Sequence, residues 1–300
     1  MATPAAAIST SNAKAIAVSS FFEGMIQPDD SWSKIVDFRT DDVAALNISA
    51  LTGVPTPGSW DGTSDLTGSQ VVATGSTGKN SHTYTVYAQA CDVNRYDILD
   101  VPNILQQFSR KQGLSVASLY AEQVWSTLGG AFATATTADG AYLCSAAHLT
   151  TGANRSNLGS TALDRSSFLA AIQSMREWVN YQGQVYDLAQ YKKYLVVPAE
   201  LEEVALQIVG SSVSSSEMQI NTAGLYNTEV IVAPYLTDAN DWFLIVDPSV
   251  EAPLTFWQRQ APRYQVIQDQ DNLKMRLIFD GAISCAASAQ PDGIYGAGVT

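Results

Sequence analysis

The sequence has few of the residues on which most catalytic and metal sites depend. Its 300 residues include two histidines, His82 and His148, and three cysteines, Cys91, Cys144 and Cys285. The cysteines are far apart, odd in number and form no CxxC pair, so a disulfide framework is excluded and a reducing compartment is favoured. A zinc site needs clustered His or Cys ligands, and the spacing of Cys144 and His148 is more typical of a structural pair.

Charged residues are also scarce, at 15% of the chain, against the roughly 25% that is usual for soluble proteins. One interpretation is that much of the surface contacts other protein; the other is an uncharged surface rich in Ser, Thr and Ala. The 29 acidic residues outnumber the 16 basic ones. This net charge of −13 argues against direct wrapping of nucleic acid, where neutralised phosphates supply most of the affinity.

The sequence lacks long apolar runs. No stretch approaches 18 uninterrupted apolar residues, so we expect no membrane span. The N-terminus is rich in Ala and Ser but has no basic segment followed by an apolar core, so we expect no signal peptide. The length allows one large domain or two of ordinary size.

Recognisable catalytic motifs are missing as well. GxSxG, the turn that carries a hydrolase serine, does not occur. The stretch 73–80 resembles a phosphate-binding loop, but Ala73 replaces the first glycine, Asn80 replaces the Ser or Thr that holds magnesium, and a strand follows instead of a helix. We therefore predict no catalytic, cofactor or metal site.

The first third of the chain predicts extended, adaptable structure. Residues 1–33 mix small and apolar side chains and indicate an arm that packs on something else. Residues 53–80 are rich in glycine and predict a long flexible loop. Residues 83–93 alternate, with Tyr84 and Val86 on one face, which predicts a strand. Its edge could be covered by a neighbour.

A long helix is expected after this strand. Asp100 could cap it, with Pro102 in its first turn, and apolar residues recur at three- and four-residue steps as far as Leu128. Gly113 could kink the helix, and a Gly-Gly pair at 129–130 could end it.

The second half predicts a mixed α/β unit. We expect helices at 165–181 and 199–209, a buried strand at 194–197, and further strands at 228–233, 241–247, 254–266 and 272–286. The basic pairs Arg110-Lys111 and Lys192-Lys193 are interpreted as surface or inter-subunit charges.

Several stretches resemble the major capsid proteins of tailed bacteriophages, which have the Hong Kong 97-type fold, and in particular the major head subunit of Mu-like phages. They are PGSWDG at 57–62, NRYDILD at 94–100, DGAYLCSAAH at 139–148 with Asn157 and LDRSSFLAA at 163–171, YLVVPAELEEVA at 194–205, and VIVAPYL at 230–236 with WFLIVD at 242–247. Each is weak alone, but together they run in family order over about 55–290.

This resemblance implies an α+β fold in five parts. They are an N-terminal arm (1–45), an extended β-hairpin loop (46–98), a spine helix (99–130) that begins the peripheral domain, an axial α/β domain (131–270), and a strand that returns to the peripheral domain (271–300). The candidate assembly residues are Trp60, Lys79, Tyr84, Val86, Arg95, Asp97, Arg110 and Lys111. Lys79 is the only lysine in 53–80, and some relatives cross-link subunits through a loop lysine.

The implied function is a non-enzymatic shell subunit of the virion, assembled in the host cytoplasm as hexamers and pentamers around double-stranded DNA that it does not bind sequence-specifically. No long charged helical segment precedes the loop, so a separate scaffolding protein is expected, with a portal as a further partner and a decoration protein as an optional one. Three alternatives stay open: a cellular nanocompartment shell of the same fold, a glycan-binding tail module, and an unrecognised hydrolase.

Overall fold

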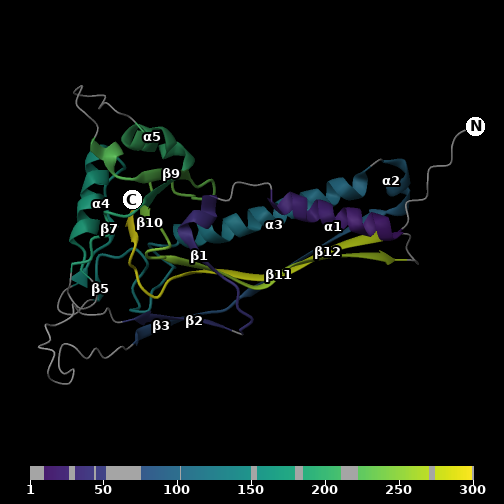
Figure 1. Cartoon of the computed structure of the whole chain (residues 1–300), viewed down its shortest axis with the longest axis horizontal. Coiled ribbons are helices and arrows are strands. Elements are labelled where there is room, and N and C mark those ends of the chain that lie inside the picture. The colour runs from purple at the N-terminus through teal and green to yellow at the C-terminus, as the bar shows by residue number, and fades with distance from the viewer. Residues whose placement is uncertain are drawn as a thin grey trace, which may run out of the picture.

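The protein is elongated, with a compact part at one end and a long extension at the other (Figure 1). The computed structural model describes residues 10–26, 31–43, 45–51, 76–101, 103–149, 154–179, 185–210, 222–269 and 274–298. Helices and mixed sheets occur together, so the α+β class expected from the sequence is confirmed.

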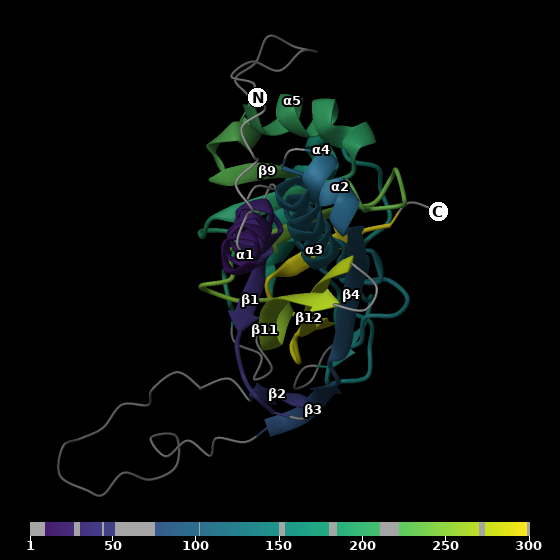
Figure 2. The same cartoon turned by 90° about the vertical axis from the view of Figure 1, so that its right-hand side faces the viewer.

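A four-stranded sheet runs along the extension in the order β1-β11-β12-β4. Its strands are β1 (Val36–Arg39), β4 (Thr85–Asn94), β11 (Leu254–Asp269) and β12 (Lys274–Ala287). β11 and β12 are antiparallel, β4 is antiparallel to β12, and β1 is parallel to the start of β11. Two helices, α1 (Thr10–Ile26) and α3 (Ile104–Gly129), lie side by side over one face of this sheet (Figures 1 and 2).

The two helices touch backbone to backbone at a pair of glycines. A Cβ atom on Gly24 would lie 2.2 Å from the Arg110 carbonyl oxygen, and one on Gly113 would lie 2.1 Å from the Phe21 carbonyl oxygen. Only glycine permits such an approach. Gly113 does not interrupt the long helix, because α3 continues through it. Residues 10–26 of the segment predicted as an arm form α1, which packs within its own subunit: the Phe21 ring stacks on Tyr264 at 4.2 Å.

The entry to the long helix differs from the prediction. Asp100 ends a separate short helix, α2 (Arg95–Asp100), and α3 begins after Asn103. Asn103 has φ of 63°, a left-handed conformation that asparagine tolerates better than most residues. Asp100 is therefore not the cap of the long helix, and Pro102 lies outside the described residues.

The compact part is built on a five-stranded sheet in the order β7-β13-β10-β8-β9. These strands are β7 (Leu158–Gly159), β8 (Lys193–Val197), β9 (Thr228–Val232), β10 (Trp242–Val246) and β13 (Ile294–Ala297). Helices α4 (Arg165–Glu177) and α5 (Glu202–Gly210) flank it (Figure 1), with short 3-10 helices η1 (Ser31–Ile35), η3 (Ala199–Leu201) and η4 (Thr222–Leu225), and a small β5 (His148–Leu149) and β6 (Asn154–Arg155) pair.

Alternate residues of the central strands enter two different cores. Tyr194 and Val196 face a cluster shared with α3 and the four-stranded sheet, whereas Leu195 and Val197 face a cluster shared with α4 and α5. Strand side chains alternate between faces, so a strand buried on both faces has a continuous apolar sequence. This joins the compact part to the extension through one hydrophobic cluster.

A separate two-stranded hairpin, β2 (Leu46–Leu51) with β3 (Ser76–His82), lies beneath the extension (Figures 1 and 2). Most of the glycine-rich segment 53–80, including Trp60, lies outside the described residues. The predicted strand 83–93 is confirmed as β4, but it pairs with β12 and not within the hairpin.

The helices and strands predicted for the second half are confirmed, with small shifts at their ends: α4 stops at Glu177, and β11 extends to Asp269. The five-part division of the chain stays a prediction. The chain crosses between the two sheets several times, since β11 pairs with β12 in the extension and β13 returns to the compact part.

The glycine contact leads to a prediction. Gly113→Ala should lower the free energy of unfolding by about 1–3 kcal/mol, because the new methyl group must push α1 away from α3. Urea denaturation measures this loss. Gly210→Ala is the matched control: a Cβ there meets nothing within 4 Å, so helix propensity alone should leave stability unchanged or slightly raised. Equal effects of the two substitutions would contradict the close-contact explanation.

Candidate assembly interface

Strand β4 forms one edge of the four-stranded sheet. Tyr87 and Cys91 turn toward the core beneath the helices. Val86, Ala88 and Ala90 are exposed, and Val86 is 63% exposed. The sequence prediction that this strand has an available edge is therefore consistent with its position, since β12 covers only one of its two sides.

The face of the four-stranded sheet that the helices leave uncovered carries two cross-strand ion pairs. Arg276 donates to both carboxylate oxygens of Asp92 on the neighbouring strand, at 2.7 and 2.9 Å. Arg263 donates from two nitrogens to one carboxylate oxygen of Asp280, at 2.8 and 3.1 Å. The hydrogen bond with Arg276 lowers the pKa of Asp92. These cross-strand pairs keep one face of the sheet suited to water or to a polar partner.

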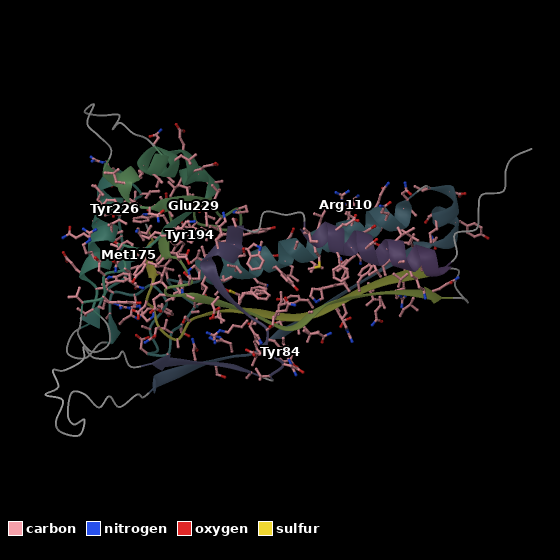
Figure 3. All side chains as sticks on the ribbon, viewed as in Figure 1. Tyr84, Arg110, Met175, Tyr194, Tyr226 and Glu229 are labelled. Atoms are coloured by element: carbon pink, nitrogen blue, oxygen red, sulfur yellow. The ribbon has the colours of Figure 1, made fainter. Side chains whose placement is uncertain are left out.

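Tyr84 lies where the hairpin meets the sheet (Figure 3). The Arg259 guanidinium stacks over its ring at 4.1 Å, and Trp257 meets the ring edge-on at 6.0 Å. The Trp257 indole donates to the Asp41 carbonyl at 2.9 Å, and Arg259 lies 3.3 Å from Asp42. Within one subunit, Tyr84 therefore holds the base of the hairpin against β11. Its predicted contact with a neighbouring subunit stays a prediction.

The other candidate residues are spread over the molecule. Arg110 and Lys111 are exposed on α3, and Asp97 is exposed on α2, which Arg95 begins. Lys79 lies in β3, where its backbone pairs with Ser49. The structure thus does not bring the candidates together at one site; Tyr84 and Val86 are the two that line the same shallow concavity, of about 520 Å³.

The prediction that Lys192 and Lys193 are surface charges is wrong for Lys193. Its side chain is buried and donates to the carbonyls of Ala189 and Tyr191, at 2.7 and 2.6 Å. Burial lowers the pKa of Lys193 to about 8. Lys192 directly precedes β8 and Lys193 is its first residue, and the two side chains point in different directions.

Lys192 instead forms an exposed clasp on Glu229, near Tyr194 (Figure 3). Its ammonium lies 2.7 Å from one oxygen of this carboxylate, and the Lys34 ammonium lies 2.7 Å from the other. Hydrogen bonds from Lys192 and Lys34 lower the pKa of Glu229. These two ion pairs connect η1, through Lys34, to the edge strand β9 of the compact part, through Glu229.

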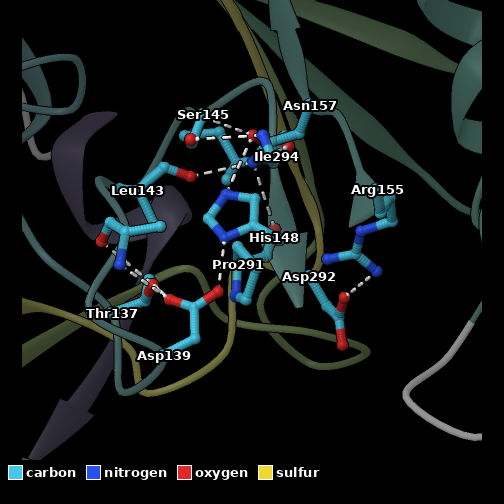
Figure 4. A network of polar contacts seen from close by, with 12 residues as sticks. Thr137, Asp139, Leu143, Ser145, His148, Arg155, Asn157, Pro291, Asp292 and Ile294 are labelled. Atoms are coloured by element: carbon cyan, nitrogen blue, oxygen red, sulfur yellow. Dashed lines mark hydrogen bonds and ion pairs between the residues drawn. The ribbon is translucent and has the colours of Figure 1, made fainter. Parts of the chain in front are cut away.

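Sequence reasoning missed a buried polar network around His148 (Figure 4). The imidazole Nδ1 lies 2.9 Å from Asp139, and Nε2 lies 3.2 Å from the Asn157 side-chain oxygen. The Asn157 amide donates to the Leu143 and Ile294 carbonyls, at 2.8 and 3.2 Å. Both histidine nitrogens therefore lie within hydrogen-bond distance of an oxygen atom. The only sequence signal for this network was that Asp139, His148 and Asn157 all lie within the stretch that resembles capsid proteins.

The network binds a long irregular loop to the C-terminal strand, and it is not an open site. His148 is 1% exposed. Burial tends to raise the pKa of Asp139, but hydrogen bonds from His148, Thr137 and the Ala141 amide outweigh it and hold this pKa below its ordinary value. Beside it, Arg155 pairs with Asp292 and stacks on Trp178 at 5.1 Å. Among the described residues, no group of His, Cys, Asp and Glu could hold a metal ion.

No helix in the described part of the chain is long and apolar enough to cross a membrane.

Comparisons with known proteins give one family and several solved structures. A family model described as phage capsid protein matches residues 83–297. No curated protein sequence matches the chain. The structure is similar to the capsid of cyanophage P-SCSP1u, with a TM-score of 0.60 and 10% identity over 90% of this chain and 88% of that one.

Two further structures are similar over nearly their whole length. Mycobacterium phage Che8 has a TM-score of 0.55 at 13% identity, with 90% of this chain and 91% of that one covered. A virus-like particle from Pyrococcus furiosus has a TM-score of 0.56 at 9% identity, with 95% and 98% covered.

The polar network leads to a prediction with a pH signature. Asp139→Asn should lower the free energy of unfolding by about 1–3 kcal/mol at neutral pH, because His148 loses its carboxylate partner. The lowered pKa makes the carboxylate's contribution complete above about pH 4, and it fades as pH falls further. The difference between wild type and variant should therefore narrow on acidification, as thermal unfolding at several pH values would measure.

Asp100→Asn is the control for this prediction, since Asp100 is exposed at the end of α2. It should have almost no effect at any pH. If Asp139→Asn were equally neutral, the network would not stabilise the fold.

Proposed function

The chain belongs to the phage capsid protein family, and from this premise we propose that it is the major subunit of an icosahedral shell, assembled as hexamers and pentamers around packaged double-stranded DNA. The match over residues 83–297 is the observation that carries the proposal. The likeness to solved capsids confirms the Hong Kong 97-type fold that the sequence resemblance implied. The family is structural, and we propose that the subunit has no catalytic activity.

The shape of the subunit supports this role. A shell places one sequence in several slightly different environments, so a rigid body needs parts that can adapt. The two sheets share one continuous hydrophobic cluster, which makes the body rigid. The hairpin β2–β3 forms its own two-stranded sheet, separate from the two larger sheets. Repeated weak contacts then suffice to close a symmetric particle.

Finer assignments rest on the sequence resemblance alone. The collinear stretches over about 55–290 support the branch typified by the Mu-like phage head subunit. A scaffolding protein, a portal and an optional decoration protein are implied partners, and assembly in the host cytoplasm is implied with them. The remaining candidate contact residues also rest on the sequence resemblance and stay predictions; they are Trp60, Lys79, Arg95, Asp97, Arg110 and Lys111.

A nanocompartment shell is the second candidate, favoured by the likeness to the Pyrococcus furiosus virus-like particle. Both candidates assemble, so the contents distinguish them. Purified particles that contain nuclease-protected DNA, formed with the packaging apparatus of the host phage, support the capsid. Particles that hold a co-purifying protein cargo and no DNA would favour the nanocompartment.

The expressed chain should form capsomer rings or particles tens of nanometres across, because a shell subunit carries its assembly contacts in its own surface. Size-exclusion chromatography followed by negative-stain electron microscopy tests this. A subunit that stays monomeric at all concentrations, including with a scaffolding partner, would contradict the proposed function.

The hairpin tip should matter for assembly and not for folding. Removing residues 56–74 spares both β2 and β3, so the subunit should stay folded and soluble but should no longer form stable shells. Circular dichroism checks the fold and microscopy checks assembly. Normal particles from this variant would show that the loop has no role in assembly.

A further inference from the structure

One buried acidic side chain has no partner within the subunit. Four acidic or basic side chains are buried in the described part of the chain, namely His148, Arg155, Lys193 and Asp241. Burying a charge costs free energy unless the group is paired or hydrogen-bonded. The first two each face a carboxylate, and Lys193 donates to two backbone carbonyls. No hydrogen bond or ion pair reaches the carboxylate of Asp241 in the described structure.

Asp241 directly precedes β10 and is 8% exposed. A Cβ atom on Gly298 would lie 3.4 Å from Asp241 Oδ1 and 3.5 Å from the Phe132 ring. Because glycine has no side chain, space remains next to this oxygen. Asp238 and Asn240 beside it are exposed, and neither Asp241 oxygen is among the described polar atoms that are both fully enclosed and unpaired. A partner could therefore reach the carboxylate from the surface.

No positive charge in the surroundings of this carboxylate offsets its own. Burial raises the pKa of Asp241 to about 6, and the negative charge of Asp238 adds to the effect. Cys144, from the loop after α3, also faces Asp241; burial raises the pKa of this thiol, and the charge of Asp241 raises it further. No basic side chain contributes to the pKa of Asp241. An ionised Asp241 is therefore unfavourable in the isolated subunit.

A metal ion bound by the described residues does not supply the missing charge. These residues contain no group of three His, Cys, Asp or Glu side chains that could hold one. The other carboxylate nearby, that of Asp238, accepts a hydrogen bond from the Asn240 amide at 2.9 Å. A compensating positive charge therefore has to come from outside the subunit, and in a shell each subunit is surrounded by other copies.

We propose that Asp241 receives a lysine or arginine side chain of a second copy when subunits assemble. The inference rests on the proposed function, and it names one residue of the interface and the chemistry of its partner. Hydrogen bonds from lysine or arginine to a carboxylate are stronger than those between neutral groups. Each copy has exposed basic side chains that form no ion pair in the described structure, among them Lys14, Arg110 and Lys111.

The proposal gives Asp241 opposite effects on the free subunit and on the shell. In the free subunit the unpaired carboxylate lowers stability, because the folded environment disfavours its charge. In the shell the same carboxylate stabilises the contact between copies. A residue with a purely structural role within one subunit would lack this opposition.

Asp241→Asn removes the charge with almost no change of shape. At pH 8 the variant subunit should have a thermal midpoint equal to or above that of the wild type. The concentration that it requires for assembly should rise by about tenfold or more, since a charged hydrogen bond is lost. Asp100→Asn makes the same change of charge at the exposed end of α2 and is the control.

Two results of this experiment would overturn the proposal. Assembly of Asp241→Asn at the wild-type concentration would show that no partner binds the carboxylate. A clearly lowered thermal midpoint would show that the carboxylate has a stabilising partner within its own subunit. In both cases the proposed function stands. If the wild-type chain forms no shells, the proposed function fails first.

The pH dependence of assembly tests the charge directly. A cationic partner keeps Asp241 ionised to lower pH, so assembly releases a proton wherever the free subunit holds it protonated, below about pH 6. The difference in assembly concentration between wild type and Asp241→Asn should therefore be larger at pH 8 than at pH 5. A difference that does not change with pH would contradict an ionic contact.

The structure of the assembled shell identifies the partner. A cryo-electron microscopy map should place a lysine or arginine nitrogen of another copy within about 4 Å of an Asp241 oxygen. An uncharged group, or solvent alone, at this position would overturn the assignment.

Discussion

The antiparallel pairing of β11 with β12 is the interaction on which the extension depends. The two strands pair from Leu254 with Ala287 as far as Asp269 with Lys274. Their apolar face, through Phe256, Leu277 and Phe279, provides the floor for α1 and α3. Their edges hold β1 and β4. Without this ladder, the helices would have nothing to pack on and β4 would have no partner.

The junction between the extension and the compact part relies on two kinds of contact. A shared hydrophobic cluster runs from α3 into the central strands of the five-stranded sheet. Polar groups then fix the irregular segments around it. His148 and Lys193 are both buried, and each is surrounded by acceptors. Burying such groups costs free energy unless they are hydrogen-bonded, so these contacts favour one arrangement of the loops over others.

The two edges of the four-stranded sheet differ in how strongly they are protected against pairing with another chain. β11 carries Arg259, Pro262 and Arg263 and two register shifts, whereas β4 pairs with β12 without a shift, has no proline and carries one charged residue, Asp92. Proline, charged residues and bulges hinder the pairing of an edge strand with another chain, and in this sheet they are concentrated on β11.

The sequence by itself determined the local elements. The alternation in 83–93, the continuous apolar run at 194–197 and the amphipathic pattern after Asp164 depend on neighbouring residues, and each forms the expected strand or helix. The collinear stretches likewise indicate a capsid protein. Those patterns depend on residue types and spacing, which the sequence shows directly.

Only the tertiary structure decided which elements meet. From the sequence Gly113 suggests a break in the long helix, but in the structure it is the point where α1 approaches α3 most closely. Lys193 suggests a surface charge, but the carbonyls of Ala189 and Tyr191 surround its ammonium. The partners of His148 come from segments on both sides of it in the sequence, and Asn157 extends the network to Ile294. These last two residues are 137 positions apart, and no local pattern encodes such contacts because a side chain's environment is set by whichever segments fold against it.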